Sequence, residues 1–106
     1  MLSIAASALV NQKKLKASVA RAERKLAPDV VRVRYSLEED WMGEPAVFFR
    51  ILLSDDASRE DRLGETVPRV ERLLADEVEP HQYGLRHYFS ERSVSEQAEL
   101  NEESWV

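Results

Sequence analysis

The sequence predicts a single α+β domain over residues 1–106, with elements in the order α-β-β-α-β and a short C-terminal helix. Residues 2–26 contain neither glycine nor proline, and their apolar side chains recur near the 3.6-residue period of a helix. Residues 29–37, 45–54 and 83–90 instead show the two-residue period of strands. A helical pattern separates the second strand from the third, so these two should run parallel. We therefore expect a three-stranded mixed sheet covered by helices.

The composition limits the class of protein. A chain of 106 residues, 43% hydrophobic and 33% charged, can bury one hydrophobic core without disulfide bonds or other cross-links. It contains no cysteine, which excludes disulfide frameworks, thiolate metal centres and cysteine nucleophiles. The apolar opening MLSIAASALV has no basic region ahead of it and is about half as long as a membrane span, so we expect it to begin a helix. These features favour a cytoplasmic protein without membrane association.

Charge is distributed unevenly along the chain. The net charge is −5, yet residues 1–27 carry +5 and the remainder carries −10. The first helix is therefore a candidate nucleic-acid-binding element. Its basic side chains are Lys13, Lys14, Lys16, Arg21, Arg24 and Lys25. A charged outer face is also what any amphipathic helix turns to water, so both interpretations stay open.

The first helix should end before Pro28, and it is long for so small a domain. Alternation in the first strand predicts a buried face made of Val31, Val33, Tyr35 and Leu37.

The second strand is apolar on both faces. Its core-facing residues should be Val47, Phe49, Ile51 and Leu53. Phe48 and Leu52 fall on the opposite face, which also needs cover. We therefore expect a homodimer or a tightly bound partner protein.

The second helix should begin at a capping box formed by Ser58 and Asp61 and end at Pro80. Its buried face is marked by Leu63, Val67, Val70, Leu74 and Val78. Pro68 lies within this pattern and predicts either a kink or a short turn followed by a shorter helix.

The third strand leads into an acidic helical tail, residues 91–106. The core face of this strand should carry Leu85, His87 and Phe89. Ser93 and Glu96 have the spacing of a second capping box, which predicts a short helix after the strand.

The loop EEDWMGEP, residues 38–45, connects the first two strands. Glu38, Glu39 and Asp40 offer oxygens to a hard cation. Neighbouring side chains at a strand end point in alternate directions, however, and the spacing does not match a calcium loop. A hairpin turn with Trp41 folded onto the sheet edge is the simpler interpretation.

The histidines, His81 and His87, complete a third hypothesis, a small metal-binding domain or enzyme that also uses the three acids. Their spacing matches no recognised ligand pattern, and we expect His87 to lie in the core. The chain contains no Gly-rich phosphate loop, serine nucleophile elbow or HExxH pattern. We accordingly expect no catalytic residue, no metal and no cofactor.

Arg32 and Arg34 project together from the first strand, and Arg50 can join them from the second. Three guanidinium groups on one sheet face, with Phe48 and Tyr88 as stacking surfaces, are typical of phosphate or RNA binding. Ion pairs with the acidic helices would satisfy the same arginines, so both interpretations remain.

The segments EDWMGEPAVFFRILLSD and YFSERSVSEQAEL resemble a family of small bacterial proteins with an acidic-Trp-Gly-Pro-Ala-Phe-Phe-Arg core and an Arg-Ser-x-Ser-Glu-Gln-Ala segment. The match covers residues 30–105. Members resemble the small partner of a two-gene pair whose neighbour encodes a helical HEPN-like protein, as in toxin–antitoxin or defence modules. The order of elements is also similar to the cytoplasmic domain of cation-efflux transporters, in architecture only, because the histidine ligands of that domain are missing here.

The resemblance implies a non-enzymatic, antitoxin-like or regulatory subunit that binds a partner protein. Aromatic anchors and arginines are the side chains that most often dominate such surfaces. The candidate contacts are Trp41, Phe48, Arg50, Arg92, Ser93, Ser95, Glu96, Gln97 and Trp105.

Overall fold

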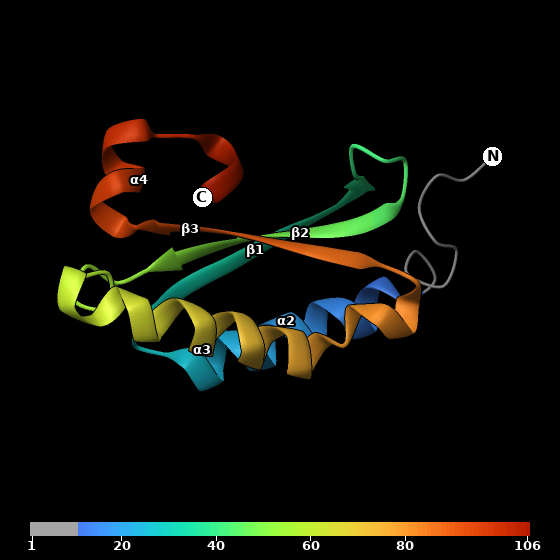
Figure 1. Cartoon of the computed structure of the whole chain (residues 1–106), viewed down its shortest axis with the longest axis horizontal. Helices are drawn as coiled ribbons and strands as arrows, with labels where there is room; N and C mark the ends of the chain where they lie inside the picture. Colours follow the sequence, from blue (N-terminus) through green and yellow to red (C-terminus); the bar gives the residue numbers. More distant parts are fainter. Residues whose placement is uncertain (1–10) are drawn as a thin grey trace.

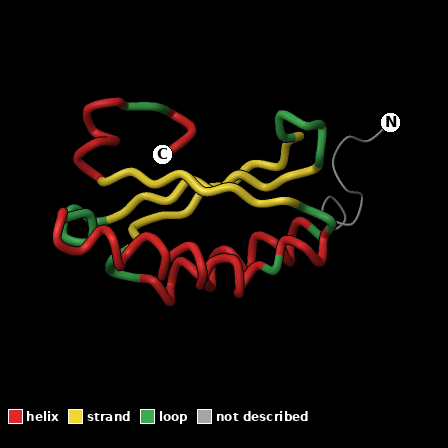
Figure 2. Tube along the Cα trace, viewed as in Figure 1, coloured by secondary structure: helices red, strands yellow, loops and turns green. Residues whose placement is uncertain are grey.

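The computed structural model describes residues 11–106 and confirms the predicted α+β order. The regular elements are α2 (Gln12–Leu26), β1 (Val30–Glu39), β2 (Pro45–Leu53), α3 (Glu60–Val78), η1 (Pro80–Tyr83), β3 (Arg86–Ser93), α4 (Val94–Leu100) and η2 (Glu103–Trp105). The long helices α2 and α3 lie on one side of the sheet (Figures 1 and 2). The tip of the β1–β2 hairpin, α4 and the C-terminal end rise on the other side.

The three strands are ordered β1-β2-β3. β1 and β2 form an antiparallel hairpin in which Arg34 lies opposite Arg50. β2 and β3 run parallel, with Phe49 opposite Phe89. Because parallel strands need a crossover connection, the chain passes through α3 between them. The predicted mixed sheet is therefore confirmed.

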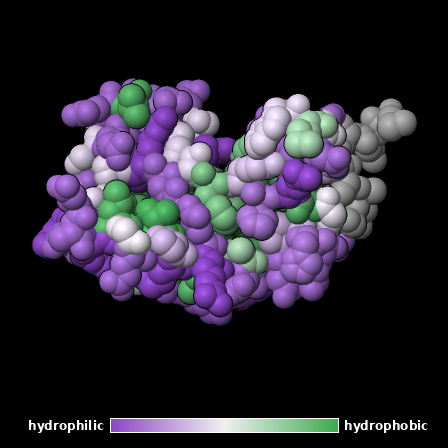
Figure 3. Space-filling view, viewed as in Figure 1, coloured by the Kyte–Doolittle hydropathy of each residue, from purple (hydrophilic) through white to green (hydrophobic). Residues whose placement is uncertain are grey.

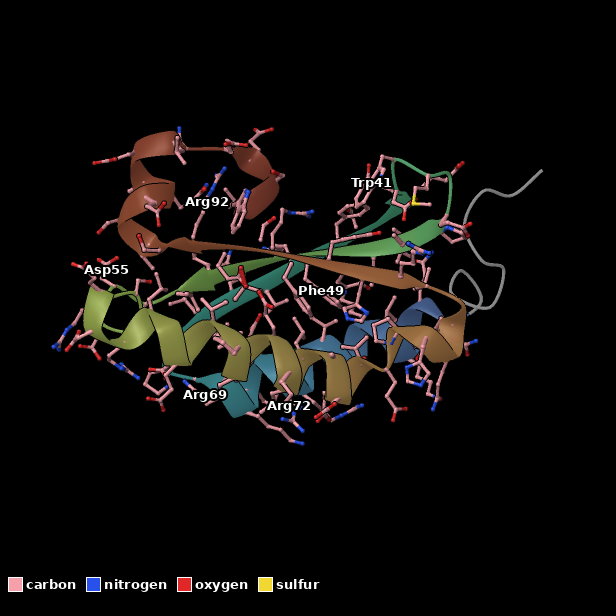
Figure 4. All side chains as sticks on the ribbon, viewed as in Figure 1. Trp41, Phe49, Asp55, Arg69, Arg72 and Arg92 are labelled. Carbon is pink, nitrogen blue, oxygen red and sulfur yellow. The ribbon has the colours of Figure 1, made fainter. Side chains whose placement is uncertain are left out.

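The core lies between the sheet and the two long helices. Phe49 and Ile51 of β2 are fully buried together with Leu15 of α2 and Leu74 of α3. Figure 4 shows Phe49 pointing from the sheet toward the helices. Burying side chains of this size contributes about 1.5–3 kcal/mol each, so this layer is a large stabilising contribution to the fold.

The first helix ends at Leu26, before Pro28, as predicted. The expected part of this helix over residues 2–10 lies outside the described residues. Lys25 and Arg24 occupy its last turn, where cations interact favourably with the negative end of the helix dipole.

The predicted buried face of β1 was wrong at Val31. Val30 pairs with Leu53 and Arg32 pairs with Leu52, so β1 contains one residue more than β2 at this point. Such a bulge turns the extra side chain out of the alternation. As a result Val30 is buried and Val31 is 48% exposed.

The start of α3 also differs from the prediction. α3 begins at Glu60, and no side chain caps it. Ser58 donates its hydroxyl to the carbonyl of Ser54 at 2.9 Å, in the turn that precedes the helix. Asp61 accepts hydrogen bonds from Arg59 instead. The Ser58 capping box was therefore wrong, because a local turn already uses that hydroxyl.

Proline does not interrupt the second long helix. Pro68 lies inside α3, which runs without a break from Glu60 to Val78. Val70, Leu74 and Val78 are buried, as predicted, whereas Leu63 is 40% exposed. Of the two predicted alternatives, the division into a turn and a shorter helix was wrong.

The second capping box is confirmed at α4. The Ser93 hydroxyl accepts a hydrogen bond from the Glu96 amide at 3.0 Å, and the Glu96 carboxylate accepts one from the Ser93 amide at 3.1 Å.

Within residues 11–106, no helix has both the length and the apolar character that crossing a membrane requires.

Candidate binding face

One face of the sheet is turned away from α2 and α3, and we call it the open face. Its side chains alternate with those of the core along each strand. They include Arg34 and Ser36 of β1, Phe48, Arg50 and Leu52 of β2, and Tyr88, Ser90 and Arg92 of β3. Trp41 and Arg92 both rise on this side (Figure 4). The space-filling view shows a notch between the hairpin and the C-terminal end (Figure 3).

Asp40 organises the tip of the hairpin. One carboxylate oxygen accepts hydrogen bonds from the amides of Met42 and Glu44, both at 2.9 Å. The other accepts a hydrogen bond from the Tyr88 hydroxyl at 2.8 Å. Burial alone would raise the pKa of Asp40, but these hydrogen bonds and the nearby charge of Arg86 hold it below its usual value. The carboxylate is thus a structural group that closes the turn.

The turn presents two large apolar side chains to solvent. Trp41 is 76% exposed and its neighbour Met42 is 63% exposed. Gly43 follows with φ of +78°, a conformation that side chains rarely adopt, and its amide bonds the Asp40 carbonyl. Trp41 is therefore held in an exposed position by an ordered turn.

An aromatic row connects the hairpin to the middle of the sheet. The centroids of Trp41 and Tyr88 are 5.0 Å apart, and those of Tyr88 and Phe48 are 5.1 Å apart. Phe48 and Tyr88 are cross-strand partners, and their rings are stacked at 23° with nearly the spacing of the strands. The two rings cover each other, which leaves less of each ring face free to stack on a nucleic-acid base.

The arginines of the open face hold the C-terminal arm, which we define as residues 101–106. Arg50 donates to the main-chain oxygen of Ser104 at 2.7 Å, and Arg34 donates to that of Val106. Arg50 also reaches the Ser36 hydroxyl at 3.1 Å. Neither predicted arrangement, an anion site or ion pairs with the acidic helices, describes these contacts of Arg34 and Arg50.

Arg92 contacts both α4 and the C-terminal arm. It donates to Gln97 at 3.0 Å and to Glu102 at 2.7 Å, and its guanidinium lies 4.4 Å from the centroid of the Trp105 ring. Trp105 is only 6% exposed. The ring is therefore an internal anchor of the arm, which leaves it unavailable to a partner in this conformation.

The remaining predicted contacts are also used within the chain. Ser93 and Glu96 cap α4. Ser95 donates both its amide and its hydroxyl to Asp55, at 3.0 and 2.7 Å, which lowers the pKa of that carboxyl. Gln97 is buried and donates to the Glu102 carbonyl at 2.7 Å. These side chains fix the tail, whereas Trp41 is a predicted contact with a large apolar side chain that is 76% exposed.

Part of the basic helix is also engaged within the chain. Lys25 and Arg21 of α2 contact Glu77 of α3 at 2.8 and 2.9 Å. Their hydrogen bonds, that of Lys25 first, lower the pKa of Glu77 against the opposing effect of burial. Lys13, Lys14, Lys16 and Arg24 remain exposed. Four of the six basic residues therefore stay available on this helix.

The acids and histidines of the third hypothesis do not come together. In the part of the chain that the structure describes, no three side chains of the His, Asp and Glu types could jointly hold a metal ion. Glu38 and Glu39 are exposed at the hairpin. His87 is exposed and lies edge-on to Phe89, with centroids 5.4 Å apart, so the prediction of a core histidine was wrong.

Glu91 is a partly buried acid that the sequence pattern did not single out. Burial, followed by the hydrogen bond and charge of Glu71, raises the pKa of Glu91 to about 8. Its Oε2 atom is buried without a hydrogen-bond partner among residues 11–106. The carboxyl borders a cavity of about 270 Å³ whose apolar lining includes Leu53 and Val67. Continued alternation from Phe89 places Glu91 on the core face, and that was the available signal.

Comparison with known proteins leaves this fold and face without a family assignment, because no family model, curated protein or solved structure matches the chain.

Proposed function

We propose that this protein is a non-enzymatic binding subunit that captures a partner protein with the tip of its β1–β2 hairpin. The exposed, ordered side chain of Trp41 is the single observation that carries the proposal. Tryptophan is among the residues most enriched at the centres of protein interfaces. Because Asp40 and Tyr88 already fix the turn, little conformational entropy is lost when Trp41 is buried by a partner.

The chemistry of the tip favours a protein partner over a nucleic acid. Glu38, Glu39, Asp40 and Glu44 surround Trp41 and Met42 in sequence. The three exposed carboxylates, those of Glu38, Glu39 and Glu44, repel phosphates, whereas a protein pocket with an apolar floor and a basic rim complements them. The mutual stacking of Phe48 and Tyr88 supports the same choice.

In the antitoxin-like form of this role, the partner is an enzyme that the bound subunit keeps inactive. The resemblance to small partners of HEPN-like proteins makes a helical HEPN-like protein the first candidate to test. A cytoplasmic location belongs to this proposal and is consistent with the lack of cysteine.

The test begins with the native complex. We expect the protein to purify with one stoichiometric partner protein, whose affinity is then measured by calorimetry against wild type and Trp41→Ala. A central anchor contributes about 2 kcal/mol or more, so Trp41→Ala should weaken binding by about 30-fold or more. Leu100→Ala is the matched control, because Leu100 is an exposed apolar residue on α4, outside the hairpin.

Two outcomes would overturn the proposal. One is a protein partner whose affinity is the same for wild type and Trp41→Ala. The other is a native complex that contains nucleic acid and no partner protein. If its affinity falls with added salt and also when Lys13, Lys14 and Lys16 are replaced by alanine, the function belongs to α2.

A further inference from the structure

The C-terminal arm contacts the open face as a bound peptide would. Arg34 and Arg50 donate to main-chain oxygens of the arm, contacts that do not depend on the identity of the arm's side chains. Two contacts depend on arm side chains, the ion pair of Glu102 with Arg92 and the packing of Trp105 beneath the same guanidinium. The open face therefore favours a segment in which an acidic residue is followed three positions later by a large aromatic residue.

The arm is attached without being part of the hydrophobic core. The core cluster is formed by residues of α2, α3, η1 and the strands, with Leu85, and it does not include Trp105. Glu102 is half exposed and Val106 is 61% exposed. Releasing the arm would thus uncover three arginines and Trp105 while the core stays closed.

We infer that the arginine half of the open face is a peptide-binding groove, which the protein's own arm occupies until an acidic-aromatic segment of the partner protein displaces it. Charge complementarity selects the occupant, since Arg34, Arg50 and Arg92 face a segment that carries Glu102 and Glu103. The inference rests on the proposed function for the existence of a partner and adds a second contact beside the hairpin.

Self-occupation has a defined consequence for affinity. A tethered arm has a high effective concentration at its own groove, so it competes with any segment added from solution. Weakening the arm should therefore raise the affinity for a separate peptide. A merely structural arm would give no such gain.

The direct test uses a fluorescent peptide with the arm sequence NEESWV and the full chain carrying Trp105→Ala. We expect this variant to bind the peptide at least tenfold more tightly than wild type does. Adding Arg92→Ala should remove the binding. Peptides that carry the Glu102→Lys or Trp105→Ala change should bind at least tenfold more weakly than NEESWV.

Circular dichroism checks that the Trp105→Ala chain is folded, and Glu102→Ala replaces it if it is not. A second measurement needs no receptor variant: excess NEESWV added to isotope-labelled wild type should shift the Trp105 indole N–H signal and leave that of Trp41 in place. The inference is overturned if a folded receptor binds NEESWV and the lysine peptide equally, or if wild type binds as tightly as the variant. Arm exchange between two copies, seen as a concentration-dependent dimer, would overturn the assignment to a partner segment.

Failure here can be separated from failure of the proposed function. The peptide assay does not involve the hairpin, so Trp41→Ala should bind NEESWV as wild type does. Conversely, a partner whose affinity falls with Trp41→Ala but not with Arg92→Ala supports binding by the hairpin and contradicts the peptide-binding groove.

Discussion

The Tyr88 hydroxyl donates a 2.8 Å hydrogen bond to the Asp40 carboxylate and so fastens the tip of the β1–β2 hairpin to β3. The Tyr88 ring also contacts the rings of both Trp41 and Phe48. A single side chain thus connects the acidic turn, the exposed tryptophan and the sheet. The position of Trp41 is therefore a property of the folded sheet, which makes it sensitive to changes some distance away along the sequence.

Replacing Tyr88 with phenylalanine should loosen the tip while keeping the aromatic row. Asp40 would lose one of the hydrogen bonds that lower its pKa, so its pKa should rise toward the usual value. Titration of the carboxyl signal by NMR measures this change, and faster hydrogen exchange at the Met42 and Glu44 amides should accompany it. An unchanged Asp40 titration would show that Tyr88 does not support the turn.

Stability should fall in acid. Asp29, Asp40, Asp55 and Glu77 all have pKa values lowered in the folded state. A lowered folded pKa gives stability that is present above the unfolded value and is lost as the pH falls through the folded value. Urea unfolding followed from neutral pH to below the ordinary range of carboxyl pKa values should show this decline. The Asp55→Asn variant should show a shallower decline than wild type.

Glu91 should cause a decline in stability of the opposite sign, as the pH rises from 4.5 to about 8. Its folded pKa of about 8 exceeds the ordinary value of 4.5, so the folded state holds a proton that the unfolded state releases. The stabilisation is complete below 4.5 and is lost as the pH rises toward 8. Glu91→Gln, which stays neutral, should flatten this part of the stability curve.

The control for Glu91 is Glu99→Gln, which removes an acid from the exposed surface of α4. This control should leave the stability curve between pH 4.5 and about 8 unchanged. If Glu91→Gln and Glu99→Gln give the same pH dependence as wild type, the raised pKa of Glu91 has no effect on folding.

Arg92→Ala should release the arm. The change removes the ion pair with Glu102, the hydrogen bond to Gln97 and the contact with the Trp105 ring. We expect a loss of about 1–2 kcal/mol of stability. In a Trp41→Phe background the fluorescence of Trp105 should shift to the red as the ring becomes exposed. Arg92→Lys, which keeps the charge but lacks the planar guanidinium, should lie between wild type and alanine.

Phe48 and Phe49 provide a matched pair on opposite faces of β2. Phe49 is 1% exposed in the core, so Phe49→Ala should cost about 3–5 kcal/mol in the free energy of unfolding. Phe48 is only partly buried on the open face, so Phe48→Ala should cost clearly less. Equal losses in urea unfolding would contradict the assignment of the two faces.

The local signals in the sequence determined the elements and most of the core. Alternation placed Val47, Phe49, Ile51 and Leu53 on one face, and the Ser93–Glu96 spacing marked the start of α4. These succeeded because backbone periodicity and capping depend on residues within a few positions of each other. The same reasoning failed at Val31 and Ser58, where a bulge and a neighbouring turn changed which way a side chain points or what it bonds.

The candidate site was only partly predictable. The choice of Trp41 as a candidate contact and the open-face position of Phe48 follow from the sequence, but the 76% exposure of Trp41 does not, since the sequence suggested a ring folded onto the sheet edge. The contacts that position these side chains join residues far apart. Tyr88 reaches Asp40 across 48 positions, and Arg50 reaches Ser104 across 54. The sequence by itself therefore determined the two faces of β2, whereas the bulge at Val31 lay beyond the reach of simple alternation. Only the tertiary structure decided that three arginines would hold the C-terminal arm and that Glu91 would lie beside Glu71. The reason is that the partner of a side chain depends on how strands and helices pack against each other, and no local sequence pattern contains that information.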